Sequence, residues 1–213
     1  MSDSGISRCL KSMGWSRKRI GKEPDRRNSP DVINIRKEYC LNMMNVPFQN
    51  IFYLDETGFN SHVISHCRWA PLGKRPSVKL PSKGKKVSVL CTIGINGFKK
   101  YMVIDRAFTS IKFKTYLDEL SYILPLNSLL IMDNAPIYRA HIITENYQNI
   151  VYLPPYSPQL NPIENFFAVL KNQYRSIYPK PNNRIHIIEA ITSLLLNFTN
   201  FNFTAFYSHR YDI

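Results

Sequence analysis

The order of the apolar runs constrains the fold of this chain more than any other feature. Two β-rich runs, residues 87–95 and 99–104, are separated by Asn96-Gly97, a pair typical of tight hairpins. An earlier apolar strand at 50–54 precedes them, so three strands come first. After these strands, helical and strand-like patterns alternate. Such alternation requires crossover connections and parallel pairing, so we expect an antiparallel edge joined to a parallel part of one sheet.

The complete predicted order is βββαβαβα, with one further helix before the first strand and one at the end. The elements outside the first three strands are expected at 31–44, 111–123, 129–132, 138–147, 150–153, 162–178 and 184–197. In the first of these helices, the expected buried face consists of Val32, Ile35, Tyr39 and Met43. With 213 residues, of which 44% are hydrophobic, the chain can bury a core on a sheet of this kind. The sequence therefore predicts an α/β fold with a mixed five-stranded sheet flanked by helices.

The first 30 residues differ in character from the rest. Residues 3–13 carry Ile6, Leu10 and Met13 at helical spacing, and Gly14 then ends the pattern. A single helix cannot bury its own apolar face, so we interpret this one as the remnant of a helix-turn-helix unit. The following basic, proline-containing segment is typical of a linker, and the sequence favours DNA contact and a solvated tail equally. We therefore expect a helix-turn-helix remnant and linker over 1–30, and the main domain over 31–213.

The charge of the chain predicts a polyanionic partner. The formal net charge is +13, and nine Lys and Arg residues lie between Thr57 and Ile104 without one acid. Each phosphate that a cation neutralises releases counterions, which favours nucleic acid as the partner. The candidate DNA-binding residues are Arg8, Lys11, Arg17, Lys18, Arg19, Lys74, Arg75, Lys83, Lys85 and Lys86. An anionic membrane is disfavoured, because the cations do not border an apolar helix face and no apolar run approaches the roughly 18 residues that span a bilayer.

The cysteines do not point to a metal or a redox site. No Cys-x-x-Cys pair is present, so the pattern excludes a zinc ribbon and a thioredoxin-like motif. His62, His66 and Cys67 lie close in sequence, but no second half of a zinc site accompanies them. Reduced thiols and ordinary packing are the expected roles.

Three acidic residues stand where predicted elements begin or end, and they are the candidate catalytic and metal-binding groups. Asp55 follows the apolar run 51–54, Asp133 follows 129–132, and Glu164 lies in the first turn of the helix predicted from Pro162. Open α/β sheets place their sites at the carboxyl ends of strands. Three carboxylates converging there would suit two divalent cations about 3.5–4 Å apart, the arrangement used in phosphodiester cleavage.

Each acid also has a purely structural interpretation. Asp55 can begin a turn at Glu56-Thr57-Gly58, and Asp133 can cap the next helix. Asn161, Pro162 and Glu164 together spell a capping box. Two neighbours have the same two kinds of interpretation. Asn134 either orients the site or forms only its turn, and the sequence favours the turn. Tyr156 either packs beside the site or belongs to the core, which is the more usual place for an aromatic residue in a proline-rich loop. The occurrence of all three acids at these points of a βββαβαβα order in a basic chain favours the site.

Four sequence segments carry a family resemblance. They are Phe52-Tyr53-Leu54-Asp55-Glu56-Thr57-Gly58-Phe59, Trp69-Ala70-Pro71-Leu72-Gly73-Lys74-Arg75-Pro76, Leu130-Ile131-Met132-Asp133-Asn134-Ala135-Pro136 and Leu153-Pro154-Pro155-Tyr156-Ser157-Pro158-Gln159-Leu160-Asn161-Pro162-Ile163-Glu164-Asn165. With them the chain resembles the catalytic region of mariner-superfamily DDE transposases, whose fold is RNase H-like. The resemblance runs from about Gly5 to Leu196 and includes residues 6–20 as the end of the family's paired helix-turn-helix region.

The resemblance implies a function for the acids. It makes Asp55, Asp133 and Glu164 a catalytic triad that binds two Mg²⁺ or Mn²⁺ ions. The implied reaction is cut-and-paste DNA transposition: water hydrolyses a strand at the transposon end, and the freed 3′-hydroxyl attacks target DNA. The implied partners are double-stranded transposon ends and target DNA, with a homodimer possible. The expected location is the nucleus of a eukaryote, or otherwise the nucleoid in the cytoplasm.

The chain departs from the family pattern in two respects. The 30 residues between Asp133 and Glu164 are fewer than usual by about one helical turn, roughly 3.6 residues, which we assign to the helix predicted at 138–147. The chain also begins inside the second DNA-binding module, so we expect an N-terminally truncated copy. The alternative function is therefore a truncated or domesticated transposase-derived protein that binds DNA without transposing it, and a remnant without any ligand is a third alternative.

Overall fold

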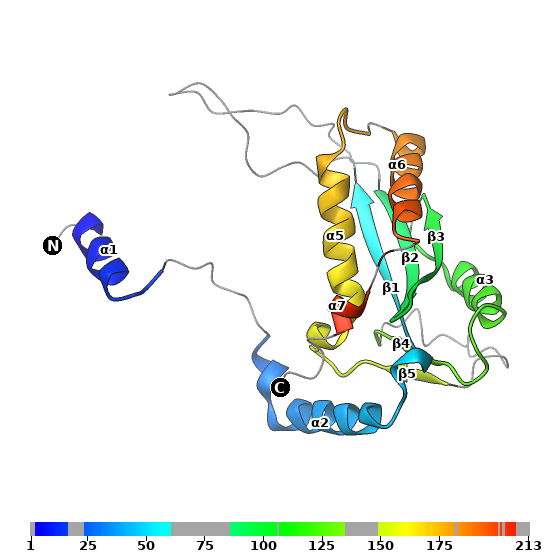
Figure 1. Ribbon diagram of the computed structural model, residues 1–213, viewed down its shortest axis with the longest axis horizontal. Helices are drawn as coiled ribbons and strands as arrows, with labels where there is room; N and C mark the ends of the chain where they lie inside the picture. Colours follow the sequence, from blue (N-terminus) through cyan, green and yellow to red (C-terminus); the bar gives the residue numbers. More distant parts are fainter. Residues whose placement is uncertain are drawn as a thin grey trace.

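The computed structural model describes residues 3–16, 24–60, 86–105, 107–134, 149–181, 183–199, 201 and 203–207. Within these residues lies one five-stranded sheet with the strand order β3-β2-β1-β4-β5 (Figure 1). The strands are β1 (Ile51–Asn60), β2 (Lys86–Gly94), β3 (Gly97–Ile104), β4 (Leu129–Met132) and β5 (Ile150–Tyr152). β1, β2 and β3 pair antiparallel, whereas β4 pairs parallel with both β1 and β5. The predicted mixed sheet is confirmed.

The described residues also form helices, of which those in the two cores flank the sheet as the sequence predicted. They are α1 (Asp3–Ser12), α2 (Pro30–Met44), α3 (Ser110–Ser121), α5 (Pro162–Ser176), α6 (Arg184–Asn197) and α7 (Thr204–Tyr207), with short 3₁₀ turns η1 (Asp25–Asn28), η2 (Phe48–Asn50) and η3 (Pro158–Leu160). The helix expected at 138–147 lies outside the described residues. Across the described part of the chain, no helix combines the length and apolar character needed to cross a membrane.

Each face of the sheet carries its own core. Alternate residues of a strand point to opposite faces, and β1 shows this clearly. Ile51 and Tyr53 pack into the cluster formed with α5 and α6, whereas Phe52 and Leu54 pack into the cluster formed with α3. Figure 1 shows α5 and α6 on one side of the sheet. The odd-numbered residues of β1 therefore face α5, and the side chain of Asp55 lies on this same face of the sheet.

The first strand is longer than the sequence predicted. We expected it to end at Leu54, but β1 continues to Asn60 because β2 remains paired with it along its whole length. The parallel partner β4 stops at the pair Leu54 and Met132, so within the part of the chain that the structure describes β1 has a neighbouring strand on only one side from Asp55 onward. Hydrogen bonds from a strand distant in sequence thus extend β1 through a polar segment that reads locally as a turn.

The N-terminal helices agree with the prediction in position but not fully in packing. The predicted helix α1 is present, and its apolar residues Ile6 and Leu10 remain 44% and 42% exposed. In α2 the expected face is wrong at Ile35, which is 45% exposed. Cys40 is buried there instead, and the part-buried Arg36 makes long-range hydrogen bonds. The buried stripe is therefore rotated so that a guanidinium lies beside it. The domain boundary between residues 30 and 31 stays a prediction.

Candidate active site

The sheet register places Asp55 and Asp133 side by side. In the parallel pair β1 and β4, Leu54 lies opposite Met132, so the two aspartates are the next residues along both strands. Ile131 packs on the α5 side and Met132 on the α3 side. By this alternation both carboxylates point to the face that α5 covers. The convergence of the two aspartates thus follows from the register and the phase of two short strands.

Glu164 approaches the same face from the first turn of α5. This helix packs across β1, with Ile163 and Phe166 fully buried beneath it. Glu164 itself is exposed, and its backbone N–H donates to the carbonyl of Asn161 at 3.1 Å. The buried residues on either side fix the rotation of the helix. They leave the carboxylate of Glu164 at the open side of the site.

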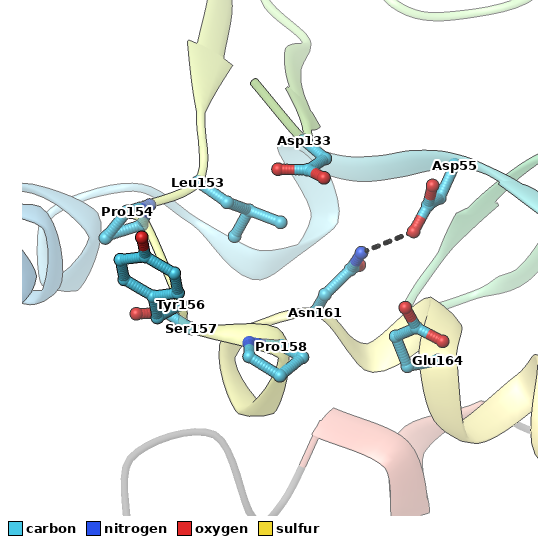
Figure 2. A pocket seen from close by; sticks show the side chains of 9 residues that line it. All are labelled: Asp55, Asp133, Leu153, Pro154, Tyr156, Ser157, Pro158, Asn161 and Glu164. Carbon is cyan, nitrogen blue, oxygen red and sulfur yellow. Dashed lines mark hydrogen bonds between the residues drawn. The ribbon is translucent and has the colours of Figure 1, made fainter. Parts of the chain in front are cut away.

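One pocket of about 170 Å³ brings the three carboxylates together. Figure 2 shows them around this pocket, although they come from three separate segments. The lining residues are Asp55, Asp133, Leu153, Pro154, Tyr156, Ser157, Pro158, Asn161 and Glu164. These nine residues include three acids and no Lys, Arg or His. The three acids thus line one pocket, as the sequence predicted, whereas their role in binding metal stays a prediction. The pocket is an anionic hollow in a strongly cationic chain.

Burial raises the pKa of Asp55 to about 7, above its ordinary value of 3.8. Desolvation is the largest cause, and the negative charges of Glu164 and Asp133 act in the same direction. The backbone N–H of Glu56, which donates to Oδ1 at 2.7 Å, opposes the rise but does not cancel it. A carboxylate in this setting is stabilised by a proton or by a cation. The pocket is therefore suited to bind positive charge.

The donor chemistry of the pocket fits Mg²⁺ or Mn²⁺. Carboxylate oxygens are the hard ligands that these ions prefer. Among the described residues, no three His, Cys, Asp or Glu side chains form a group that could hold a metal ion by themselves. Mg²⁺ does not require such a cage, because it commonly binds one or two carboxylates together with substrate phosphates and water. The residues present therefore fit a divalent cation that is shared with a phosphate chain.

The structure bears on the structural interpretations of the two aspartates. Asp55 does not begin a turn, since it lies within the continuous strand β1. Asp133 accepts a hydrogen bond from the backbone N–H of Asn134 at 2.7 Å, as Asp55 does from that of Glu56. The helix that Asp133 was expected to cap lies outside the described residues. The local contact is compatible with the pocket, because the side chain of Asp133 also lines it.

The capping-box interpretation of Glu164 is wrong. Asn161 occupies the N-cap position of α5, but its side chain makes no capping hydrogen bond. Its Nδ2 instead donates to Oδ2 of Asp55 at 3.1 Å, as the dashed line in Figure 2 shows. Only 4% of Asn161 is exposed, and its Oδ1 is buried without a hydrogen-bond partner. Asn161 is therefore a residue of the pocket that sequence reasoning assigned to the helix.

The loop before α5 is held by residues that the sequence did not single out. Ser157 Oγ donates to the carbonyl of Pro155 and accepts from Nε of Arg36, both at 3.0 Å. Nη2 of Arg36 donates to the carbonyl of Arg27 at 2.9 Å, just before α2. One guanidinium thus links the start of α2 to the pocket loop. No local pattern predicts this contact, because Arg36 and Ser157 are 121 residues apart.

Tyr156 lies at the pocket and not in the core. Its side chain is 43% exposed and lines the pocket, so the core interpretation is wrong. Its φ of 55° is in the left-handed region, which residues other than glycine adopt only at some energetic cost. The hydrogen bonds of Ser157 stabilise this turn from the following residue. The loop therefore keeps an unfavourable backbone conformation at the edge of the acidic pocket.

The two asparagines at helix N-caps give a direct test of this reading. Asn183 caps α6 in the ordinary way, with Oδ1 accepting from the N–H of His186 at 2.8 Å. We expect Asn183→Ala to lower the free energy of unfolding by about 1 kcal/mol, the usual value of a lost cap. Asn161→Ala should cost less in metal-free buffer, because it loses no cap and because removal of its unpaired acceptor offsets part of the loss of the N–H donated to Asp55. Denaturant unfolding in EDTA measures both, and a loss in Asn161→Ala as large as that in Asn183→Ala would contradict this prediction.

Of the ten predicted DNA-binding residues, three are described by the structure. Arg8 and Lys11 lie exposed on α1, and Lys86 lies exposed at the start of β2. Lys86 passes close to Gly58 of the neighbouring strand, where an added Cβ would lie 3.1 Å from its Cε. The remaining seven are outside the described residues: Arg17, Lys18, Arg19, Lys74, Arg75, Lys83 and Lys85. The role of all ten residues in DNA binding stays a prediction.

The strand order and the flanking helices define an RNase H-like fold. The fold matches the Mos1 transposase paired-end complex with the left transposon end at a TM-score of 0.74 and 17% identity, covering 96% of this chain and 66% of that one. The Mos1 mariner paired-end complex with Mn matches at a TM-score of 0.77 and 15% identity, covering 98% of this chain and 68% of that one. The catalytic domain of Mos1 mariner transposase matches at 0.61 and 13% identity, with 92% of this chain and 91% of that domain covered.

Sequence comparison identifies the family. The model of the DDE superfamily endonuclease family matches residues 50–185, which include Asp55, Asp133 and Glu164. The chain belongs to the DDE superfamily endonuclease family. No curated protein matches the sequence. The chain spans about two thirds of the Mos1 chains in the paired-end complexes, and it spans nearly the whole of their catalytic domain.

Proposed function

We propose that this chain is the catalytic part of a cut-and-paste DNA transposase. The observation that carries the proposal is the single pocket lined by Asp55, Asp133 and Glu164 on an RNase H-like sheet. Support also comes from the similar structures, which include a Mos1 transposase paired-end complex with the left transposon end and a Mos1 strand transfer complex. The proposed reaction cleaves a strand at the transposon end and joins its 3′-hydroxyl to target DNA.

In this proposal each pocket residue has a distinct task. Asp55 and Asp133, adjacent in the sheet, hold divalent cations, and Glu164 binds from the exposed side, where a DNA strand can approach. Two bound Mg²⁺ or Mn²⁺ ions would supply an activated oxygen nucleophile and relieve negative charge on the phosphate. Mos1 complexes with Mn and with Mg are among the similar structures. Asn161 orients Asp55 through its amide N–H.

The charge distribution supports double-stranded DNA as the substrate. An anionic pocket repels a phosphate backbone, but the chain as a whole carries a formal charge of +13. The cationic residues attract the backbone and release its counterions, and bound cations neutralise the pocket itself. Both transposon ends and target DNA are proposed partners, and a homodimer that holds two ends is part of the proposal. In a eukaryotic host, this substrate also implies a nuclear location.

A nicking assay tests the function. We expect the full chain to nick duplex DNA in Mg²⁺ or Mn²⁺ and not in EDTA. DNA binding is measured by gel shift across a salt series. The logarithm of the binding constant should fall linearly with the logarithm of the salt concentration, with a slope of about −0.9 for each phosphate neutralised. DNA binding without nicking in either cation would support the alternative, a truncated or domesticated DNA-binding protein. A chain that does not bind DNA at low salt would contradict both functions.

A further inference from the structure

The side-chain amide of Asn161 is the most unusual polar group of the pocket. Its Nδ2 donates to Oδ2 of Asp55 at 3.1 Å, and its Oδ1 is buried without a partner. Because only 4% of Asn161 is exposed, bulk water does not satisfy this oxygen. Buried polar atoms in folded proteins almost always have a hydrogen-bond partner. An unpaired acceptor at a pocket therefore points to a donor that a ligand supplies.

The helix does not explain this orientation. The N–H of Glu164, which an N-cap side chain usually satisfies, donates instead to the backbone carbonyl of Asn161 at 3.1 Å. At the corresponding position of α6, Asn183 turns its Oδ1 to the helix and accepts from His186. Two asparagines in the same position thus point their amides in different directions. The amide of Asn161 makes no capping hydrogen bond to α5 and instead donates to the carboxylate of Asp55.

The surroundings determine which ligand can supply the donor. The charged groups that line the pocket, Asp55, Asp133 and Glu164, are carboxyl groups, so their ionised forms offer only acceptors. A hydrated divalent cation provides what is missing, because its coordinated waters are donors and Mg²⁺ retains several of them when bound. Carboxylates can take the cation while the amide oxygen takes a water of its hydration shell. This division of labour is typical of groups around a metal site.

We propose that Asn161 is a positioning residue of the cation site, acting on both sides of it. Its N–H group fixes Oδ2 of Asp55, and its Oδ1 accepts a hydrogen bond from the hydration shell of the bound cation. The inference rests on the proposed function, since it requires that Asp55 bind a divalent cation. It adds a fourth residue, Asn161, to the three acids. The task of this residue is to orient the carboxylate of Asp55 and a water molecule bound to the cation.

Binding of Mn²⁺ alone, without DNA, tests the inference. Isothermal titration calorimetry on the full chain should show Asn161→Ala binding Mn²⁺ about 10–100-fold more weakly than the wild type, the usual effect of losing an outer-shell partner. The matched control is Asn183→Ala, which removes a true N-cap outside the pocket and should leave the Mn²⁺ affinity unchanged. Circular dichroism and thermal unfolding in EDTA confirm that each variant is folded.

The outcomes separate the inference from the proposed function. If the wild type and Asn161→Ala bind Mn²⁺ equally, the inference is overturned and the three-acid site stands. If the folded wild type binds no Mn²⁺, both the inference and the proposed metal-dependent function are overturned. A weaker affinity in Asn183→Ala as well would trace the effect to general loss of helix stability and would also overturn the inference. As a second readout, Mn²⁺ should raise the unfolding temperature of the wild type more than that of Asn161→Ala.

Discussion

Asp133→Ala and Glu164→Gln should each abolish metal-dependent DNA cleavage while the chain remains folded. Both side chains are exposed, so their removal leaves no cavity in the core. Cations at such a site contribute several kcal/mol of charge stabilisation in the transition state, and each 1.4 kcal/mol corresponds to a factor of about ten. The expected loss in cleavage rate is therefore at least about 10³-fold. Nicking assays under single-turnover conditions measure it.

A helix glutamate outside the pocket provides the matched control for Glu164. Glu189 is exposed on α6 and does not line the pocket, so Glu189→Gln makes the same chemical change elsewhere. It should leave both cleavage and stability unchanged. If Glu164→Gln lowers stability and cleavage in parallel, Glu164 has a structural role and the catalytic assignment is wrong. DNA binding in EDTA should not weaken in either variant, because the acids do not contact phosphate without a cation.

The metal-free protein should lose stability as the pH rises from about 4 to 7, and Asp55 is the cause. Its pKa is about 7 in the folded chain, above the ordinary 3.8, so the folded state retains a proton that the unfolded state has released. The favourable contribution is complete below the ordinary pKa and is lost as the pH passes the folded pKa. The change reaches up to about 4 kcal/mol, at 1.36 kcal/mol for each pH unit.

Substitution and cation binding should both flatten this pH dependence. Asp55→Asn removes the titrating group but keeps the shape, so the variant should be more stable than the wild type at pH 8 in EDTA. Denaturant unfolding at pH 5 and pH 8 measures the difference. Saturating Mg²⁺ should stabilise the wild type at pH 8 and not the variant. Cys91, opposite Asp55 on β2, does not contribute, because burial raises the pKa of its thiol well above the ordinary range.

The sequence predicted the sheet well because its strands and helices are locally encoded. Period-2 and period-3.6 patterns place β4 and α6 at the observed bounds, and the hairpin between β2 and β3 follows from Asn96-Gly97. Gly97 has a φ of 117°, a value that residues with a side chain rarely adopt. The end of β1 was not predictable in this way. Most of its last residues are not apolar, and they pair with β2, which lies beyond a long stretch of chain.

The three acids could be predicted because each follows or begins an element with a strong pattern. Asn161 and Arg36 could not, since their decisive contacts join residues 106 and 121 positions apart. In the case of Asn161, a sound local rule gave the wrong answer. Asparagine before proline at a helix start normally caps the helix, and only the position of Asp55 across the pocket shows why the amide turns away.

The double hydrogen bond of Arg36 has a mechanical consequence. The same side chain holds the carbonyl of Arg27 and the hydroxyl of Ser157, so it ties the segment entering α2 to the turn leading to Glu164. The side chain of Arg27 adds a second contact, to Oε1 of Gln159 at 3.5 Å. A displacement of residues 27–30 therefore reaches the loop of Tyr156 and Ser157 through side-chain contacts and not through the sheet.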